Sequence, residues 1–212
     1  DWVVQAKRFQ ARPDTLSDRE VLELSRLILR SYSPAESPSG FNDGELVPDN
    51  RMYPKGTLLM WLQSLDEQEA LQSQVDNLQS VGLLNRVQQR NLADRQSILE
   101  RELKSRKTFL DSMQALAVKG FVSKPTLLQN QAEVDSLESK IFSNRDSLVK
   151  LQTELQQSFI KLRKSLAQMI SNGFVFAEND LYIRQVIPND GENINTGGIL
   201  LLFSRQSLNN PS

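Results

Sequence analysis

Two long stretches of this sequence carry apolar residues at a strict seven-residue interval, and a short break separates them. In residues 126–171 the interval is unbroken, and its members are Leu127, Val134, Ile141, Leu148, Leu155, Leu162 and Met169. In residues 62–117 a second frame contains Leu71, Leu78, Leu92, Leu99 and Met113, with Asn85 and Arg106 in its two other slots. A heptad repeat of this length predicts α-helices that bury a narrow apolar seam against another helix.

The break between the two stretches reads "ALAVKGFVSKPTLLQ". Gly120 can end the first helix in a left-handed cap, and Ser123 can cap the second. Pro125 then falls in the first turn, where its missing N–H costs nothing. A connection this short predicts an antiparallel hairpin over residues 62–171, with arms of about 70–80 Å and a tip near residues 118–125. The alternative is that each arm pairs with another chain, as in a coiled-coil scaffold protein.

The predicted tip has apolar residues where a turn is usually polar. We expect a partner to contact this tip, because exposed apolar patches mark interaction sites. The residues expected to form the contact are Leu116, Gly120, Phe121, Val122, Ser123 and Leu127. The alternative is that Phe121 and Val122 fold back over the last helical turns as a hydrophobic cap.

Polar residues also occupy slots of the predicted seam. Asn130 and Asn144 follow the heptad positions of the second arm by three residues, and Arg106 lies in the frame of the first arm. Buried polar residues in a coiled coil can set its register at a cost in stability. The other interpretation is that the supercoil turns these slots toward solvent.

The segments that flank the hairpin differ from it in composition. Residues 1–33 contain one predicted helix, which starts at a capping box formed by Ser17 and Glu20 and ends near Ser31. Residues 34–61 and 172–212 are rich in turn residues, and they contain strand candidates such as "GELV", "TLLMWL" and "GFVF".

The two turn-rich segments share a short pattern. "NRMYPKGTLL" in the first is similar to "GENINTGGIL" in the second, and each has an apolar residue three positions before a glycine. Each segment is too small to bury a core alone. We therefore expect them to be two halves of one small β domain into which the hairpin is inserted.

The composition excludes several classes of function. The chain contains no Cys and no His, which removes disulfides, thiolate chemistry, most zinc sites and the commonest general base. Lys and Arg total 25 against 26 for Asp and Glu, so the chain lacks the basic excess of a nucleic-acid-binding protein. We expect no enzymatic activity, no cofactor, no metal site and no nucleic-acid partner.

Three stretches resemble the HlyD-like membrane-fusion proteins, which are periplasmic adaptors of type I secretion and tripartite efflux systems. They read "YPKGTLLMWLQSLDEQEALQSQ", "LAVKGFVSKPTLLQNQAEVDSLESKI" and "VFAENDLYIRQVIPNDGENINTGGILLLF". Together they span roughly residues 45–204 and correspond to the first lipoyl-like half, the hairpin tip with its second arm, and the second lipoyl-like half. The tip pattern of that family is an Arg, a Leu and a Ser. Leu116 and Ser123 match it, and Ser112 stands at the arginine position.

The resemblance implies a fold and a function. The fold would be mainly α, with a long coiled-coil hairpin inserted between two halves of a lipoyl-like (barrel-sandwich hybrid) β domain. The protein would be a periplasmic homo-oligomer, held at the inner membrane by a segment outside this chain. It would link an ABC-type exporter of protein, peptide or small-molecule cargo to an outer-membrane channel of the TolC type.

Carrier domains of the lipoyl and biotinyl type use the same half-motif with a modified lysine at a turn. Neither half shows that lysine in its motif, and Lys55 is interpreted as a solvated turn residue. A carrier domain is the weakest alternative function.

Overall fold

The structure is a computed structural model that describes residues 2–31, 51–62, 64–186 and 201–204. The chain divides into two compact units. The first unit comprises residues 1–77 and 159–212, and the second unit comprises residues 78–158. The sequence candidates "GELV" and "GENINTGGIL" lie outside the described residues.

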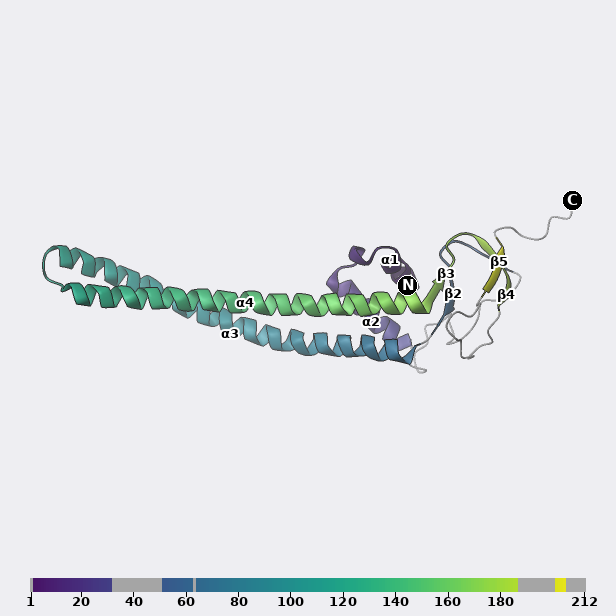
Figure 1. Cartoon of the computed structure of the whole chain (residues 1–212), viewed down its shortest axis with the longest axis horizontal. Helices are drawn as coiled ribbons and strands as arrows, with labels where there is room; N and C mark the ends of the chain where they lie inside the picture. The colour runs from purple at the N-terminus through teal and green to yellow at the C-terminus, as the bar shows by residue number, and fades with distance from the viewer. Residues whose placement is uncertain (1, 32–50, 63, 187–200, 205–212) are drawn as a thin grey trace. The chain divides into compact units, whose positions relative to one another are not determined.

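Two long helices dominate the described chain, as the heptad frames predicted (Figure 1). Helix α3 comprises Leu65–Val118 and helix α4 comprises Lys124–Gly173. Both begin and end within a few residues of the predicted bounds. The turn between them coincides with the predicted tip.

Within the second unit the two helices run antiparallel and face each other. Leu99 of α3 packs with Leu137 and Ile141 of α4 in one buried cluster, and Leu103 covers its side. These positions belong to the predicted seam. The hairpin prediction is therefore confirmed, and the arms pair within one chain.

Two asparagines interrupt this seam and bond across it. The Asn85 side-chain amide of α3 donates to the main-chain oxygen of Leu151 at 2.5 Å. Leu92 follows Asn85 by seven residues on α3. Its main-chain oxygen accepts a hydrogen bond from the Asn144 side-chain amide of α4 at 2.9 Å. Both asparagine side chains are buried. Each arm thus contributes one amide to the backbone of the other arm in consecutive layers.

The other two polar slots behave differently. Asn130 donates to the main-chain oxygen of Thr126 in its own helix, at 2.8 Å. Arg106 is exposed and pairs with Glu133 at 3.0 Å. Of the three polar seam residues singled out from the sequence, Asn144 alone makes a buried cross-hairpin bond.

The N-terminal region of the first unit contains helix α1, Trp2–Ala11, the short 3-10 helix η1, Pro13–Thr15, and helix α2, Asp18–Ser31. The capping box of α2 is confirmed. The main-chain N–H of Ser17 donates to Glu20 Oε2 at 2.7 Å, and its hydroxyl contacts the same oxygen at 2.7 Å. Helix α1 was not predicted from the sequence.

An arginine of α4 holds this N-terminal region. Nη1 of Arg163 donates to the main-chain oxygens of Pro13 and Leu16, at 2.6 and 2.9 Å. Its Nη2 pairs with Asp18 at 2.9 Å, at the start of α2. One guanidinium group therefore binds three successive points of the connection between α1 and α2.

The strands of the first unit form two small antiparallel sheets. Strands β1 (Arg51–Tyr53), β4 (Leu181–Val186) and β5 (Leu201–Ser204) form one sheet in the order β1-β4-β5. Strands β2 (Leu58–Trp61) and β3 (Phe174–Phe176) form the other. In both sheets a strand that precedes the hairpin pairs with a strand that follows it.

The interior around the strands is apolar and compact. Leu59, Ala177, Leu181 and Ile183 form its buried cluster. Beside β2 and β3, the Trp2 ring of α1 packs against Trp61 and Phe174, with ring centroids 5.5 and 5.7 Å apart. Aromatic packing therefore holds helix α1 against strands β2 and β3.

Candidate functional site

The hairpin turn closes helix α3 with a defined hydrogen-bond pattern. The N–H of Phe121 donates to the main-chain oxygen of Leu116 at 3.1 Å, and the N–H of Gly120 donates to Ala117 at 2.9 Å. This pair of bonds is the Schellman motif, in which the residue directly after the helix C-cap has a left-handed backbone conformation. Gly120 supplies that residue with φ of 80°.

The start of helix α4 is also capped as predicted. The Ser123 hydroxyl accepts from the N–H of Thr126 at 3.4 Å and contacts the Thr126 hydroxyl at 2.7 Å. Pro125 follows in the first turn of the helix. Caps on both sides fix the backbone of the turn, so the direction in which each side chain leaves the backbone is defined.

Phe121 is the aromatic residue of this turn. In a Schellman motif the residue after the left-handed glycine frequently makes an apolar contact with the last helical turn. Phe121 stands in that position, but its side chain is 76% exposed. The fold-back alternative is therefore wrong for Phe121, whereas Val122 is half-buried.

The other predicted tip residues vary in exposure. Leu116 is 42% exposed, Leu127 is half-buried, and Gly120 and Ser123 are exposed. The structure brings all of them to the two helix ends around the turn (Figure 1). Their contact with a partner remains a prediction.

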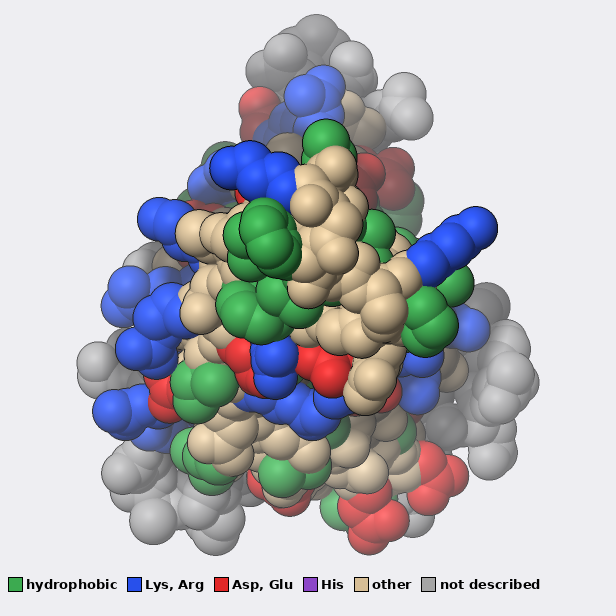
Figure 2. All heavy atoms as spheres, turned by 90° about the vertical axis from the view of Figure 1, so that its left-hand side faces the viewer, with side chains coloured by type: hydrophobic (Ala, Val, Ile, Leu, Met, Phe, Trp, Pro, Cys, Tyr) green, Lys and Arg blue, Asp and Glu red, His purple; other side chains and the backbone are tan. Residues whose placement is uncertain are grey.

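Two further residues belong to this apolar surface and were missed from the sequence. Val118 is 90% exposed at the end of α3, and Leu128 is 60% exposed in the first turns of α4. Each lies next to a seam position rather than on it. The heptad pattern therefore could have predicted that both side chains are exposed. Figure 2 looks at the turn end on and shows hydrophobic side chains gathered near the middle of that view.

We call the four exposed apolar side chains of this region the tip surface. Its members are Leu116, Val118, Phe121 and Leu128. In the sequence, the charged residues nearest to these positions are basic. Between Asp111 and Glu133 the chain contains Lys119 and Lys124 and no acidic residue.

Further exposed apolar side chains are spaced along the arms of the second unit. At 100° per residue, one group of exposed side chains falls within about 60° on α3, roughly 120° from the buried seam. Apart from Leu116, which belongs to the tip surface, this group consists of Leu84, Val87, Ile98 and Phe109. On α4 the exposed group about 120° from the seam consists of Phe142 and Val149, apart from Leu128 of the tip surface. We call these two groups the flank stripes.

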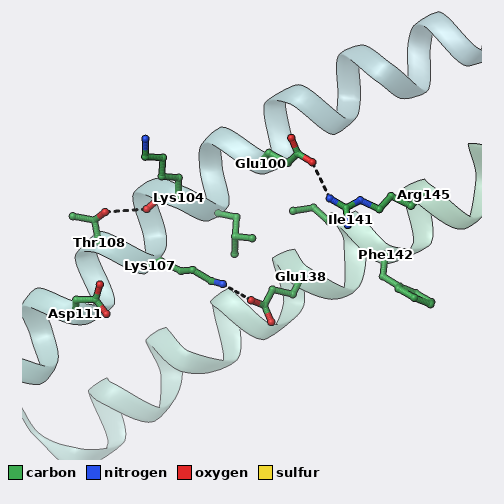
Figure 3. Close-up of a pocket in the computed structure, with 10 residues that line it drawn as sticks. Glu100, Lys104, Lys107, Thr108, Asp111, Glu138, Ile141, Phe142 and Arg145 are labelled. Carbon is green, nitrogen blue, oxygen red and sulfur yellow. Dashed lines mark hydrogen bonds and ion pairs between the residues drawn. The ribbon is translucent and has the colours of Figure 1, made fainter.

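A shallow groove lies beside one flank stripe (Figure 3). Ion pairs bridge the two arms here: Lys107 contacts Glu138 at 2.6 Å and Arg145 contacts Glu100 at 3.2 Å. The Gln96 amide and the Arg145 guanidinium both bond Glu100, and they hold the pKa of its carboxyl below the ordinary range. Two ion pairs therefore bridge the groove, which is also lined by the apolar side chains of Leu103, Ile141 and the exposed Phe142.

Within residues 2–31, 51–62, 64–186 and 201–204, no group of three acidic side chains is placed to hold a metal ion. The N–H of Lys55 donates to Asp180 at 2.7 Å in the turn between β1 and β2. No helix in the described part of the chain has the length and apolar character needed to cross a bilayer.

Comparison with known proteins gives a weak structural likeness. No protein-family model matches this chain, and no curated protein matches it. Among solved structures it is similar to the periplasmic adaptor protein EmrA, with 12% sequence identity and a TM-score of 0.31. The match covers 74% of this chain and 66% of that chain, so this chain spans just under two thirds of that protein. At this level the likeness assigns neither a family nor a function.

Proposed function

We propose that this chain is the hairpin-bearing part of a non-enzymatic periplasmic adaptor, which links an inner-membrane exporter to an outer-membrane channel. The observation that carries the proposal is the exposure of Phe121 at a turn whose backbone is fixed by caps on both sides. A fixed turn that presents an aromatic ring to solvent loses apolar burial, unless a partner covers the ring.

The strand pairing supports the adaptor architecture. β1 pairs with β4 and β2 pairs with β3, so both strand pairs join chain from before and after the hairpin. This is the arrangement expected when a hairpin is inserted into one β domain. We propose that the strand-bearing segments, residues 34–61 and 172–212, are the two lipoyl-like halves of that domain.

The flank stripes support a homo-oligomer. Each arm has one apolar face that packs within the hairpin and several exposed apolar side chains about 120° away that do not. Such side chains are expected on helices that have neighbours on two sides. We propose that the α3 stripe of one copy packs against the α4 stripe of the next.

The remaining parts of the proposal concern the surroundings of the protein. The inner-membrane partner would be an ABC-type exporter, and the outer partner a channel of the TolC type. The protein would reside in the periplasm, attached to the inner membrane. Support for these parts comes from the three sequence stretches that resemble the HlyD-like proteins.

The scaffold alternative requires arms that pair between chains. The buried bonds of Asn85 and Asn144 instead connect the two arms of one chain. Spin labels at Ser112 and Gln129 test this directly, because a hairpin places them at a short distance within one chain. A short distance that disappears on dilution with unlabelled protein would favour the scaffold.

The tip is tested by export in cells that lack their own copy of the protein. The full-length protein with Leu116→Asp and Val122→Asp, or with Phe121→Ser, should restore no export. The exported proteins, peptides and small molecules are compared in the medium by mass spectrometry. The matched control is Leu65→Ser, because Leu65 is 75% exposed at the other end of α3 and lies far from the turn in sequence.

Folding must be unchanged for this test to be informative. The helical circular-dichroism signal and the thermal midpoint should stay near those of the wild type in every variant, since all the changed side chains are at least partly exposed. Normal export by the tip variants, with normal protein levels, would rule out the tip as the distal contact.

A further inference from the structure

The charges beside the tip surface specify the chemistry of its partner. Lys119 and Lys124 are exposed, and within the described residues neither takes part in an ion pair. The nearest acidic residues in the sequence are Asp111 and Glu133, which leaves 21 residues with two positive charges and no negative one. Three other basic side chains of the second unit pair with glutamates across the arms: Arg106 with Glu133, Lys107 with Glu138 and Arg145 with Glu100.

The backbone of the turn also contains N–H groups that are available as hydrogen-bond donors. In the described part of the chain, the N–H groups of Val122 and Ser123 donate to no protein group. They lie between the two lysines in sequence and directly before α4. Unpaired N–H groups and ammonium groups both take carboxylate or carbonyl oxygens as partners.

On this basis we propose that the tip surface docks into an apolar socket of a protein, and that carboxylates form the rim of this socket. Phe121 and Val118 fill the socket, while Lys119 and Lys124 face the acidic rim. The inference rests on the proposed function, and it adds the chemistry that an outer partner must have.

An anionic lipid surface is the other partner that apolar and basic groups could suit. Lipid hydrocarbon has no acceptor for the N–H groups of Val122 and Ser123, and each unpaired group costs several kcal/mol there. Two lysines add only about 1 kcal/mol each at an anionic membrane. A protein socket can satisfy the N–H groups and the charges together, so the turn fits a protein better.

The test compares charge and shape variants of the full-length protein. The first double variant, Lys119→Glu with Lys124→Glu, reverses the rim charges. The second, Lys119→Arg with Lys124→Arg, keeps them. The control reverses two other exposed lysines of α4, Lys140 and Lys164, and so produces the same net charge. Phe121→Ser reports on the socket itself.

Two probes are used in binding measurements. The first is the purified outer-membrane channel of the same cells, at about 50 and about 300 mM salt, because screening weakens contacts between exposed charges. The second is a set of vesicles, made either of phosphatidylcholine alone or of equal parts phosphatidylglycerol and phosphatidylcholine. Circular dichroism checks that each variant keeps its helices.

The proposal expects binding to the channel that weakens with salt and falls about tenfold or more on rim charge reversal. The arginine variant and the Lys140 and Lys164 control should bind like the wild type, and Phe121→Ser should bind weakly. Replacing rim carboxylates of the channel by lysine should restore binding of the reversed variant.

Other outcomes overturn the inference in distinguishable ways. If Phe121→Ser weakens channel binding but charge reversal and salt do not, the acidic rim is wrong and the proposed function stands. If the wild type binds vesicles with phosphatidylglycerol and not the channel, the partner is a membrane and both proposals fail. If it binds neither probe, the outer-channel contact itself is wrong, and the inference falls with it.

Discussion

The side-chain amide of Asn144 in α4 donates a hydrogen bond of 2.9 Å to the main-chain oxygen of Leu92 in α3. The same amide bonds Gln96 Oε1 at 2.9 Å. One layer away, Asn85 makes the reciprocal bond to Leu151 of α4. In the observed register each asparagine lies opposite a main-chain oxygen of the other arm, and we expect this pair of buried amides to help set the register of the hairpin.

Asn144→Leu should raise stability and loosen register. Oδ1 of Asn144 is buried without a hydrogen-bond partner among the described residues, and leaving such a group unpaired costs about 1–3 kcal/mol. We expect the free energy of unfolding to rise by about 1 kcal/mol. The distance distribution between spin labels at Ser112 and Gln129 should broaden.

The matched control for that substitution is Asn130→Leu, because Asn130 bonds only within its own helix. This variant should leave the distance distribution narrow. An unchanged distribution in Asn144→Leu would show that packing of the apolar layers alone sets the register.

Arg163→Ala should release the N-terminal region of the first unit. The guanidinium group donates to Pro13, Leu16 and Asp18, and hydrogen bonds to charged groups contribute about 1.5–3 kcal/mol. Amide hydrogens of α1 and α2 should exchange faster in the variant, while those of residues 78–158 keep their rates. Lys164→Ala, at the neighbouring exposed position, should change neither set of rates.

Arg163→Lys separates charge from geometry in the same experiment. A lysine keeps the positive charge near Asp18 but has no planar fork for the two main-chain oxygens. We expect exchange rates close to those of Arg163→Ala. Rates close to the wild type would mean that the ion pair, and not the main-chain bonds, holds this region.

The capping box of α2 should contribute a pH-dependent term. The Ser17 main-chain N–H, and then its hydroxyl, bond the Glu20 carboxylate and lower its pKa. A pKa that is lower in the folded state stabilises the fold above the ordinary glutamate range, and this stabilisation is lost as the pH falls through the folded pKa. α2 should therefore loosen in mild acid.

This dependence is measured by NMR titration of the Glu20 side-chain carbon. In Ser17→Ala the pKa should rise only part of the way, because the main-chain donor stays in place. Glu20→Gln should remove the local pH dependence and retain the helix. A Glu20 pKa at or above its ordinary value in the wild type would contradict the capping box in solution.

Two glycines of the hairpin should respond to alanine in opposite directions. Gly120 has φ of 80°, a conformation that costs an alanine about 1–2 kcal/mol, so Gly120→Ala should lower the thermal midpoint. A Cβ on Gly82, inside α3, would meet nothing within 4 Å. Gly82→Ala should raise stability by about 1 kcal/mol, since alanine favours the helix.

A calorimetric comparison of the two variants checks this pair. A lower midpoint for Gly82→Ala would indicate that the glycine is needed for a contact outside this chain. An unchanged midpoint for Gly120→Ala would mean that the turn adopts another conformation in solution.

The sequence was sufficient for the elements that depend on neighbours in the chain. The heptad frames located both arms, and Gly120 and Ser123 located the turn, because helix caps and helical periodicity are local properties. The capping box at Ser17 and Glu20 was predictable for the same reason. Leu116 and Phe121 of the tip surface were predicted from the sequence. Val118 and Leu128 were missed because each lies beside a seam position.

Helix α1 could not be predicted in this way. Its ten residues are too few for a stable isolated helix, and its support comes from Trp61 and Phe174, which follow far later in the chain. Strand β1 was missed for a related reason, because three residues become a strand only when β4 pairs with them.

The polar residues of the seam separate what the sequence determined from what only the tertiary structure decided. By itself the sequence determined that two heptad helices meet at a glycine and a serine cap, which predicted a hairpin, since caps and helical periodicity are local properties. Whether Asn144 is buried and bonded or Arg106 is exposed and paired was decided only by the tertiary structure. The physical reason is that burial depends on which backbone oxygen or carboxylate the other arm presents, and a heptad position does not encode that.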